Sequence, residues 1–422
     1  MKWSKSTLGE IVANDRGLVQ TGPFGSSLHQ SDYSEEGIPV IMPTNITDGR
    51  VSQAGIARIP ENTANRLERH KLKPRTIVLP RRGEITKRAF IREDQEGWLC
   101  GSGCLKIETH DTEVMPEFLY YYMAQHDVCQ WLEKHAVGST MLNLSAGIVN
   151  DMPVHYPQRE LQQYIANTLA AYDDLMENNR RRMVLLEESA RLLYREWFVH
   201  LRFPGHEHTR ITNGVPQGWE RVELNSIINV THGYAFQGAD FSDEPTSLVL
   251  TTPGNFRIGG GIKLGKPKFY SEAGPLPPNY ILAPMDLIVT MTDLSKDSDT
   301  LGYPAFVPKL PDLTFLHNQR VGKVVPRGDF FPKHFLYFVL CDEPYRHHVV
   351  GAATGGVIKH TSPTRILSYK ADLPLDRKLI EDFEAFASPL FAQINILVES
   401  NEKLRTARDL LLQRLMSGGI AL

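Results

Sequence analysis

The sequence is poor in cysteine, with four in 422 residues. Cys100, Cys104, Cys129 and Cys341 are too few and too irregularly spaced for a disulfide framework, which favours a reducing compartment such as the cytoplasm. The first two could begin a zinc site, but no second pair of ligands follows at zinc-site spacing. We therefore expect buried thiols, no metal, and a cytoplasmic protein.

Long apolar runs and an excess charge of one sign are also missing. No stretch approaches the roughly 20 apolar residues of a membrane span, and Met1–Lys5 opens without the apolar segment of a signal peptide. We expect no contact with a membrane. The 46 basic and 49 acidic residues leave a net charge of −3. Any surface that binds nucleic acid must therefore be local.

The familiar catalytic motifs are incomplete. Gly260, Gly265 and Lys266 have the spacing of a phosphate-binding loop, but Pro267 replaces the Ser or Thr that would hold magnesium. The segment 277–280 contains the letters of an amino-methyltransferase motif in the wrong order, and no Gly-x-Ser-x-Gly or His-Glu-x-x-His occurs. The sequence therefore predicts a chain that is not an enzyme.

The chain does contain a duplication. The opening Trp3 and Leu8 return as Trp219 and Leu224, and further landmarks recur at a nearly constant separation: Lys106 and Lys323, Pro116 and Pro332, Gly138 and Gly355, Leu186 and Leu404. A unit of this size is a tandem domain rather than a solenoid repeat. We expect two copies of one module.

Each module is predicted to mix strands and helices, giving an α/β (α+β) fold. Short β-rich runs with nearby Gly or Pro occur in both copies, at 37–42, 76–79 and 104–107 and at 247–250, 286–290 and 321–325. A helix then starts at Pro116 and at Pro332, because a first helical turn tolerates proline. The glycine-containing loops 138–140 and 354–356 follow. These are ordinary turns or places where the backbone approaches a phosphate closely.

A long helix ends each module. Continuous helix from 158 to 200 would extend about 65 Å. Heptad spacing predicts a seam on both helices: Met176, Asn179, Met183, Leu186 and Leu193 on the first, and Ile394, Leu397, Asn401, Leu404 and Leu411 on the second. The alternative is that each helix packs wholly within its own module. We expect the seams to pair antiparallel with pseudo-twofold symmetry, with Asn179 and Asn401 setting register or facing a partner protein.

Basic side chains cluster once in each copy. These clusters contain Lys71, Lys73, Arg75, Arg81, Arg82, Lys87 and Arg88 in the first copy and Arg257, Lys263, Lys266 and Lys268 in the second. Such residues neutralise phosphates or read base edges, although a solvated charged face has the same composition. We add Asn255 for its chemistry, and Ser139 and Lys359 because they lie in or just after the glycine loops, which have equivalent places in the two copies. All fourteen are candidate DNA-binding residues.

Four patterns together resemble the specificity (S) subunit of type I restriction-modification systems, over the whole chain. They are the opening 218–224, the loop 233–236, the helix start 157–162, and the helix end 193–198 followed by 202–205. Two places depart from the family's habit. The loop 22–25 matches less well than its counterpart, and the second helix start, 373–378, lacks the usual Gln.

The resemblance implies two target-recognition domains, 1–157 and 206–375, separated by spacer helices 158–205 and 376–422. It implies recognition of a bipartite, asymmetric site in double-stranded DNA, with one domain per half-site. It also implies docking of two methyltransferase (M) subunits on the helices, and of restriction (R) subunits through them. S-adenosylmethionine, ATP and magnesium would then bind the partners, with no cofactor in this chain. The alternatives are a methyltransferase or nuclease with degenerate motifs, and a scaffold that binds no DNA.

Overall fold

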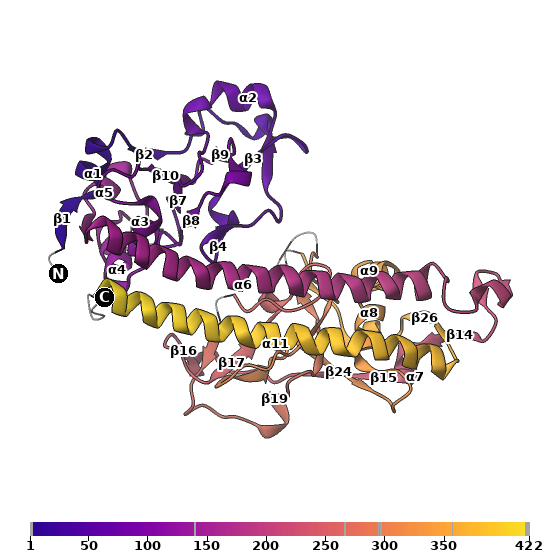
Figure 1. Ribbon diagram of the computed structural model, residues 1–422. Coiled ribbons are helices and arrows are strands. Elements are labelled where there is room, and N and C mark those ends of the chain that lie inside the picture. The colour runs from indigo at the N-terminus through magenta and orange to yellow at the C-terminus, as the bar shows by residue number, and fades with distance from the viewer. Residues whose placement is uncertain are drawn as a thin grey trace. The chain divides into compact units, whose positions relative to one another are not determined.

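The computed structural model describes residues 3–138, 141–265, 267–293, 295, 298–356 and 358–417 (Figure 1). The chain divides into two compact units. The first combines the chain up to Leu175 with the segment from Arg405 onward, and the second runs from Met176 to Leu404. No helix in the described part of the chain is long and apolar enough to cross a membrane.

The first unit is built on an antiparallel four-stranded sheet. Its order is β2 (Leu18–Thr21), β10 (Cys104–Glu108), β7 (Ile77–Pro80) and β8 (Ala89–Phe90). A second sheet joins β6 (Ala57–Ile59), β3 (Ile38–Ile41) and β9 (Leu99–Cys100), with β3 parallel to β9. The remaining named elements are β1 (Ser4–Thr7) paired with β11 (Pro153–Tyr156), β4 (Ile46–Thr47) paired with β5 (Arg50–Val51), and helices α1 (Leu8–Asn14), α2 (Glu61–Arg66), α3 (Pro116–Tyr122), α4 (His126–His135) and α5 (Ala146–Asn150).

The second unit repeats this topology. Its four-stranded sheet has the order β15 (Ile228–His232), β24 (Val321–Pro326), β20 (Leu287–Thr290) and β22 (Pro304–Phe306). A five-stranded sheet joins β16 (Phe241–Ser242), β18 (Lys268–Tyr270), β17 (Leu248–Thr251), β23 (Thr314–His317) and β19 (Ile281–Leu282), with β17 parallel to β23. The other elements are β14 (Trp219–Glu223) paired with β26 (Lys370–Pro374), β21 (Thr292–Asp293) paired with β25 (Lys359–His360), β12 (Ile211–Thr212) paired with β13 (Val215–Pro216), and helices α7 (Leu224–Ile227), α8 (Lys333–Val339), α9 (Glu343–Val350) and α10 (Pro363–Leu367).

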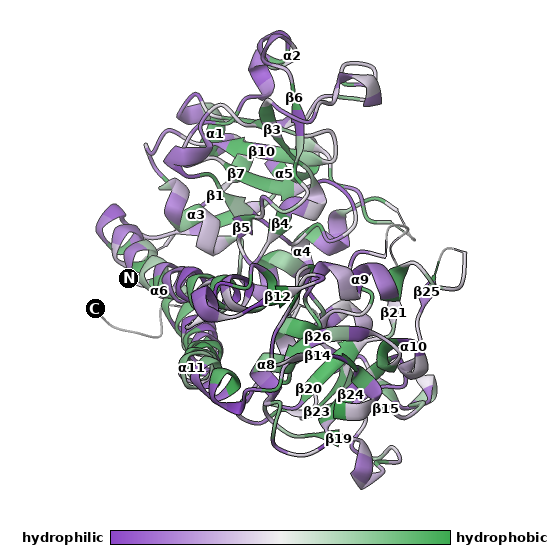
Figure 2. Cartoon of the chain, turned by 90° about the vertical axis from the view of Figure 1, so that its right-hand side faces the viewer, coloured by the Kyte–Doolittle hydropathy of each residue, from purple (hydrophilic) through white to green (hydrophobic). Residues whose placement is uncertain are grey.

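The predicted duplication is therefore confirmed in the four-stranded sheet, which has the same strand order in both units, and in the parallel pairs β3–β9 and β17–β23. In each copy an early strand pairs with the strand that directly precedes a long helix, namely β1 with β11 and β14 with β26. The predicted helix at the proline is present in both copies, as α3 and α8, and buries Phe118 and Phe335 completely. Each such side chain contributes about 1.5–3 kcal/mol relative to exposure. Figure 2 shows the hydrophobic residues concentrated on the sheet strands.

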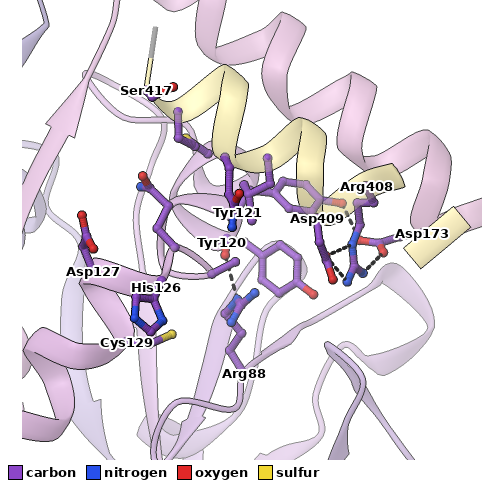
Figure 3. Close-up of a pocket in the computed structure, with 15 residues that line it drawn as sticks. Arg88, Tyr120, Tyr121, His126, Asp127, Cys129, Asp173, Arg408, Asp409 and Ser417 are labelled. Carbon is purple, nitrogen blue, oxygen red and sulfur yellow. Dashed lines mark hydrogen bonds and ion pairs between the residues drawn. The ribbon is translucent and has the colours of Figure 1, made fainter. Parts of the chain in front are cut away.

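The two long helices are α6 (Arg159–Tyr194), which continues into a π-turn, η5 (Arg195–Val199), and α11 (Arg377–Met416). Inside the second unit Asn179 bonds to Asn401, and Phe198 packs on Phe383. The contact that lies later in the first helix thus lies earlier in the second, so the helices run antiparallel. Inside the first unit Asp173 pairs with Arg408 (Figure 3). The antiparallel pairing predicted from the heptads is thus confirmed within each unit. All ten seam residues are buried or half-buried.

Candidate nucleic-acid interface

In the first unit, the glycine-containing loop folds back on the end of strand β7. Val137 and Asn143 exchange two backbone hydrogen bonds of 3.0 and 2.9 Å, which closes a hairpin. The amide of Leu144 then donates to the carbonyl of Arg81 at 2.8 Å, and Arg82 lies opposite Asn143. The hairpin is therefore fixed to the two residues that follow β7.

The second unit builds the same hairpin. Thr354 and His360 exchange backbone hydrogen bonds of 3.1 and 2.9 Å. The amide of Thr361 donates to the carbonyl of Met291 at 3.0 Å, just past β20, and Thr292 lies opposite His360. The hairpin is thus a shared feature of the two units, while its side chains differ.

A glycine makes each hairpin possible. Gly138 and Gly355 have φ of 116° and 104°, a region that side chains rarely adopt. A Cβ atom would lie 2.4 Å from the carbonyl oxygen of Met141 at the first glycine and 2.0 Å from that of Ile358 at the second. The predicted turn role of these loops is confirmed. Contact with a phosphate stays a prediction.

In the first unit, the side chains on and beside the hairpin hold one another in position. Arg81 donates from Nε to Oδ1 of Asn143 at 3.3 Å, and its guanidinium lies 5.4 Å from the ring centre of the exposed Phe24. Arg82 is exposed. Neither arginine forms an ion pair with any residue in the described part of the chain. Both therefore keep a full positive charge available to a ligand.

The corresponding surface in the second unit is less basic. Thr292 Oγ1 lies 3.1 Å from Nδ1 of the exposed His360. Next to them, burial acts to raise the pKa of Asp293, but hydrogen bonds from Ser295 and Thr300 hold it below the ordinary value. This carboxylate closes a local loop by accepting those bonds.

Most other basic residues predicted in the first copy are engaged inside the fold. Lys71 pairs with Glu68, Lys87 with Glu84, and Arg75 with both Glu117 and Asp111. Lys73 is exposed but lies 4.0 Å from the carboxylate of Glu108, and Arg88 donates to the carbonyl of Tyr120. A hydrogen bond from Arg75 to Glu117 raises the pKa of Arg75 above its ordinary range, against the opposing effect of burial. Arg88 lines a cavity of about 810 Å³ together with Tyr120, His126 and Arg408 (Figure 3).

The residues predicted in the second copy have mixed surroundings. Asn255 accepts a bond from the amide of Thr252 at 2.8 Å, which shapes a turn, as Asn45 does for Met42 in the first unit. The others are Arg257 paired with Glu187, the exposed Lys263, the exposed Lys268 over the ring of Phe241, and Lys359 bonded to the carbonyl of Gly355. Ser139 and Lys266 lie outside the described residues. DNA binding by these fourteen residues stays a prediction.

Sequence reasoning did not select Phe24, Asn143, Thr292 or His360. The signal was present, because Asn143 and His360 occupy the same place in the two aligned glycine loops. Their importance depends on the hairpin reaching the strand end, and this contact joins segments far apart in the chain.

The cysteines are buried or half-buried free thiols, as predicted. Burial raises the pKa of the Cys100 thiol to about 12 and that of Cys341 also to about 12. Such thiols are poor metal ligands and poor nucleophiles at neutral pH, because the thiolate is the reactive form. Among the residues that the structure describes, no group of three or more His, Cys, Asp or Glu is placed to hold a metal ion.

Comparison with known proteins places this geometry in context. A family model described as "Type I restriction modification DNA specificity domain" matches residues 2–188. The chain is 32% identical over 124 residues to the Type I restriction enzyme MjaIX specificity subunit of Methanocaldococcus jannaschii, which covers 28% of this chain and only 29% of that protein. It is 20% identical over 331 residues to the MjaVIII specificity subunit of the same organism, covering 76% of this chain and 74% of that one.

A solved structure shows the same fold. The crystal structure of the type I restriction-modification S subunit from M. genitalium aligns with 98% of this chain and 96% of its own, with a TM-score of 0.52 and 15% sequence identity. At that identity the likeness concerns the fold alone. It includes both units and both long helices.

Proposed function

Since the chain belongs to the family of type I restriction-modification specificity subunits, we propose that it reads a bipartite, asymmetric site in double-stranded DNA. Each unit contacts one half-site with the hairpin at the end of its central sheet. The observation that carries this proposal is that two units of one topology present the same hairpin with different polar side chains, Arg81 and Asn143 in one and Thr292 and His360 in the other. Two units that share a backbone topology but carry different polar side chains would bind different half-site sequences.

In this proposal the chain itself catalyses nothing. Two M subunits dock on α6 and α11, and R subunits join through them. Exposed apolar residues on α6 and on the π-turn that continues it support such docking. Leu185, Leu192 and Val199 recur every seven residues and are 66%, 51% and 42% exposed. S-adenosylmethionine, ATP and magnesium would act on those partners, in the cytoplasm.

Methylation mapping tests the proposal directly. The chain is expressed with its M subunits in cells, and methylated positions are read across the genome. We expect a single two-part sequence, one part of which changes when residues 1–157 are replaced by the corresponding domain of another S subunit. A swap that altered neither half, or a purified chain that methylated or cut DNA without partners, would contradict the proposal.

Measuring DNA affinity at increasing salt concentration distinguishes a DNA-binding subunit from a scaffold that binds no DNA. Binding of the purified complex to a duplex carrying the mapped site should weaken by about 10³–10⁵ between 50 and 200 mM salt, if six to ten phosphates are contacted. A scaffold that binds no DNA would show no affinity at any salt concentration.

A further inference from the structure

In the first unit, Arg81 and Asn143 leave several hydrogen-bond donors available beside the hairpin. Oδ1 of Asn143 accepts from Arg81 Nε, and Nδ2 of the same amide has hydrogens to donate. Arg81 keeps both Nη groups, and neither they nor Nδ2 of Asn143 bonds to a residue that the structure describes. Arg81 and Asn143 thus present a cluster of donors.

This donor cluster is oriented before any ligand binds. The Nε bond to Asn143 fixes one edge of the Arg81 guanidinium, and the ring of Phe24 lies 5.4 Å from its central carbon. A guanidinium held at its Nε edge beside an aromatic ring leaves free its two Nη groups, which its planar geometry keeps side by side. That arrangement matches the paired acceptors O6 and N7 of guanine, which a guanidinium binds with two parallel hydrogen bonds in the major groove.

The second unit offers a different chemistry at the equivalent place. Thr292 is buried and engages Nδ1 of the exposed His360, which leaves Nε2 as the other ring nitrogen for a ligand. Met291, at the position equivalent to Arg81, is buried in the core. No guanidinium accompanies His360 on the β21–β25 ladder, so a two-point contact with guanine is not available from this pair.

We infer that Arg81 and Asn143 form the base-reading pair of the first unit and select guanine in its half-site, while His360, held by Thr292, reads the second half-site. The inference rests on the function proposed above and assigns residues to it. Arg81 reads the base, and Asn143 both positions the guanidinium and donates from Nδ2.

Four variants test the assignment by methylation mapping in cells that carry the M subunits. Arg81→Gln should reduce discrimination for one guanine of the first half-site by about 5- to 150-fold, the value of one two-point contact, and leave the second half-site unchanged. His360→Ala should relax only the second half-site. Asn143→Asp keeps an acceptor for Arg81 but replaces the Nδ2 donor by an oxygen, so it should alter the same half-site as Arg81→Gln.

Lys5→Gln is the matched control, because it removes one exposed positive charge from the same unit at a residue outside the candidate set. It should lower DNA affinity at most uniformly and leave the methylated sequence unaltered. Thermal unfolding of each purified variant shows whether it has folded. If Arg81→Gln does not fold, Asn143→Asp decides the outcome, since that change is nearly isosteric.

The results separate the two proposals. If the wild-type chain confers no methylated sequence of its own, the proposed function fails. If domain exchange changes one half-site while folded Arg81→Gln, Asn143→Asp and His360→Ala variants leave the sequence unaltered, this assignment alone is wrong. A first half-site without guanine would overturn it as well.

Discussion

Asn179 and Asn401 form a buried amide pair between the two long helices. Asn179 donates from Nδ2 to Oδ1 of Asn401 at 2.9 Å, and Asn401 donates in turn to the carbonyl of Met176 at 3.2 Å. The two residues are 4% and 6% exposed. Sliding one helix along the other would leave both amides buried without partners, so the pair selects one register, as a polar seam residue does in coiled coils.

Replacing one member of this pair should destabilise the second unit. In Asn179→Leu the Oδ1 atom of Asn401 stays buried without a donor, which lowers the free energy of unfolding by about 1–3 kcal/mol. The double variant Asn179→Leu, Asn401→Leu leaves no unpaired amide and should recover most of that loss. Urea unfolding of the two single variants and the double variant measures the coupling. Strictly additive losses would contradict this account of the pair.

A charged pair joins the two long helices in the first unit. The Asp173 carboxylate accepts from Arg408 at 2.5 Å and from the hydroxyl of Tyr121 at 2.7 Å (Figure 3). Burial raises the pKa of the Tyr121 hydroxyl well above its ordinary value, and the Asp173 charge raises it further. This hydroxyl therefore stays protonated and donates to the carboxylate, so that Tyr121 and Arg408 together neutralise and solvate Asp173.

Removing the Arg408 charge should loosen the end of α11. Arg408→Met leaves the largely buried Asp173 carboxylate without its cation, and we expect a loss of about 1.5–3 kcal/mol, the value of a hydrogen bond to a charged group. Amide hydrogen exchange of residues 405–417 should become faster. Lys403→Met is the control, since the exposed i,i+4 pair of Lys403 with Glu399 is worth only about 0.3–0.5 kcal/mol. Equal effects of the two changes would show that the Asp173 contact has no special importance.

A methyl group at either hairpin glycine should disable one half-site only. Gly138→Ala forces a side chain into positive φ and against a carbonyl oxygen, at a cost of about 1–3 kcal/mol that the hairpin avoids by opening. Methylation mapping should then show relaxed recognition of the first half-site, and Gly355→Ala should do the same to the second. Gly83→Ala is the matched control. Gly83 also has a positive φ, but a Cβ atom there would lie in open space, so this variant has the backbone strain without the clash. Loss of both half-sites in one variant would contradict independent reading by the units.

The sequence predicts the parts of this fold that depend on local periodicity. The heptads gave the long helices and the Asn179–Asn401 contact, because a helix repeats its faces at fixed spacing. The duplication likewise identified Lys106 and Lys323 as equivalent. Only the structure shows their role, since each forms an ion pair within its own sheet, Lys106 with Glu108 and Lys323 with Asp286.

The candidate site was harder to predict because its contacts join distant segments. Counting charges between 71 and 88 could not show that Arg75 is bound by Glu117 or that Arg88 reaches the carbonyl of Tyr120. These partners lie on α3, which a linear count does not include. For the same reason Asn143 became a candidate only once the hairpin was seen against Arg81.

The buried His70 should make the stability of the first unit depend on pH. His70 is 2% exposed and its Nε2 accepts from Arg69 at 3.0 Å. Burial, followed by the charges of Arg69 and Lys106, lowers its pKa to about 4. Below pH 6.5 the unfolded chain therefore binds a proton that the folded chain excludes, so stability is complete above that pH and falls as the pH drops toward 4.

At pH 5 this linkage should reduce the free energy of unfolding by about 2 kcal/mol relative to pH 7.5, since each pKa unit corresponds to about 1.4 kcal/mol. His70→Gln keeps an acceptor for Arg69 but does not titrate in this range, so that part of the loss should disappear. Urea unfolding of the first unit at the two pH values measures the difference. The same substitution at the exposed His126, in the same unit, should leave the loss in place. An unchanged pH dependence in His70→Gln would show that this histidine does not exclude the proton.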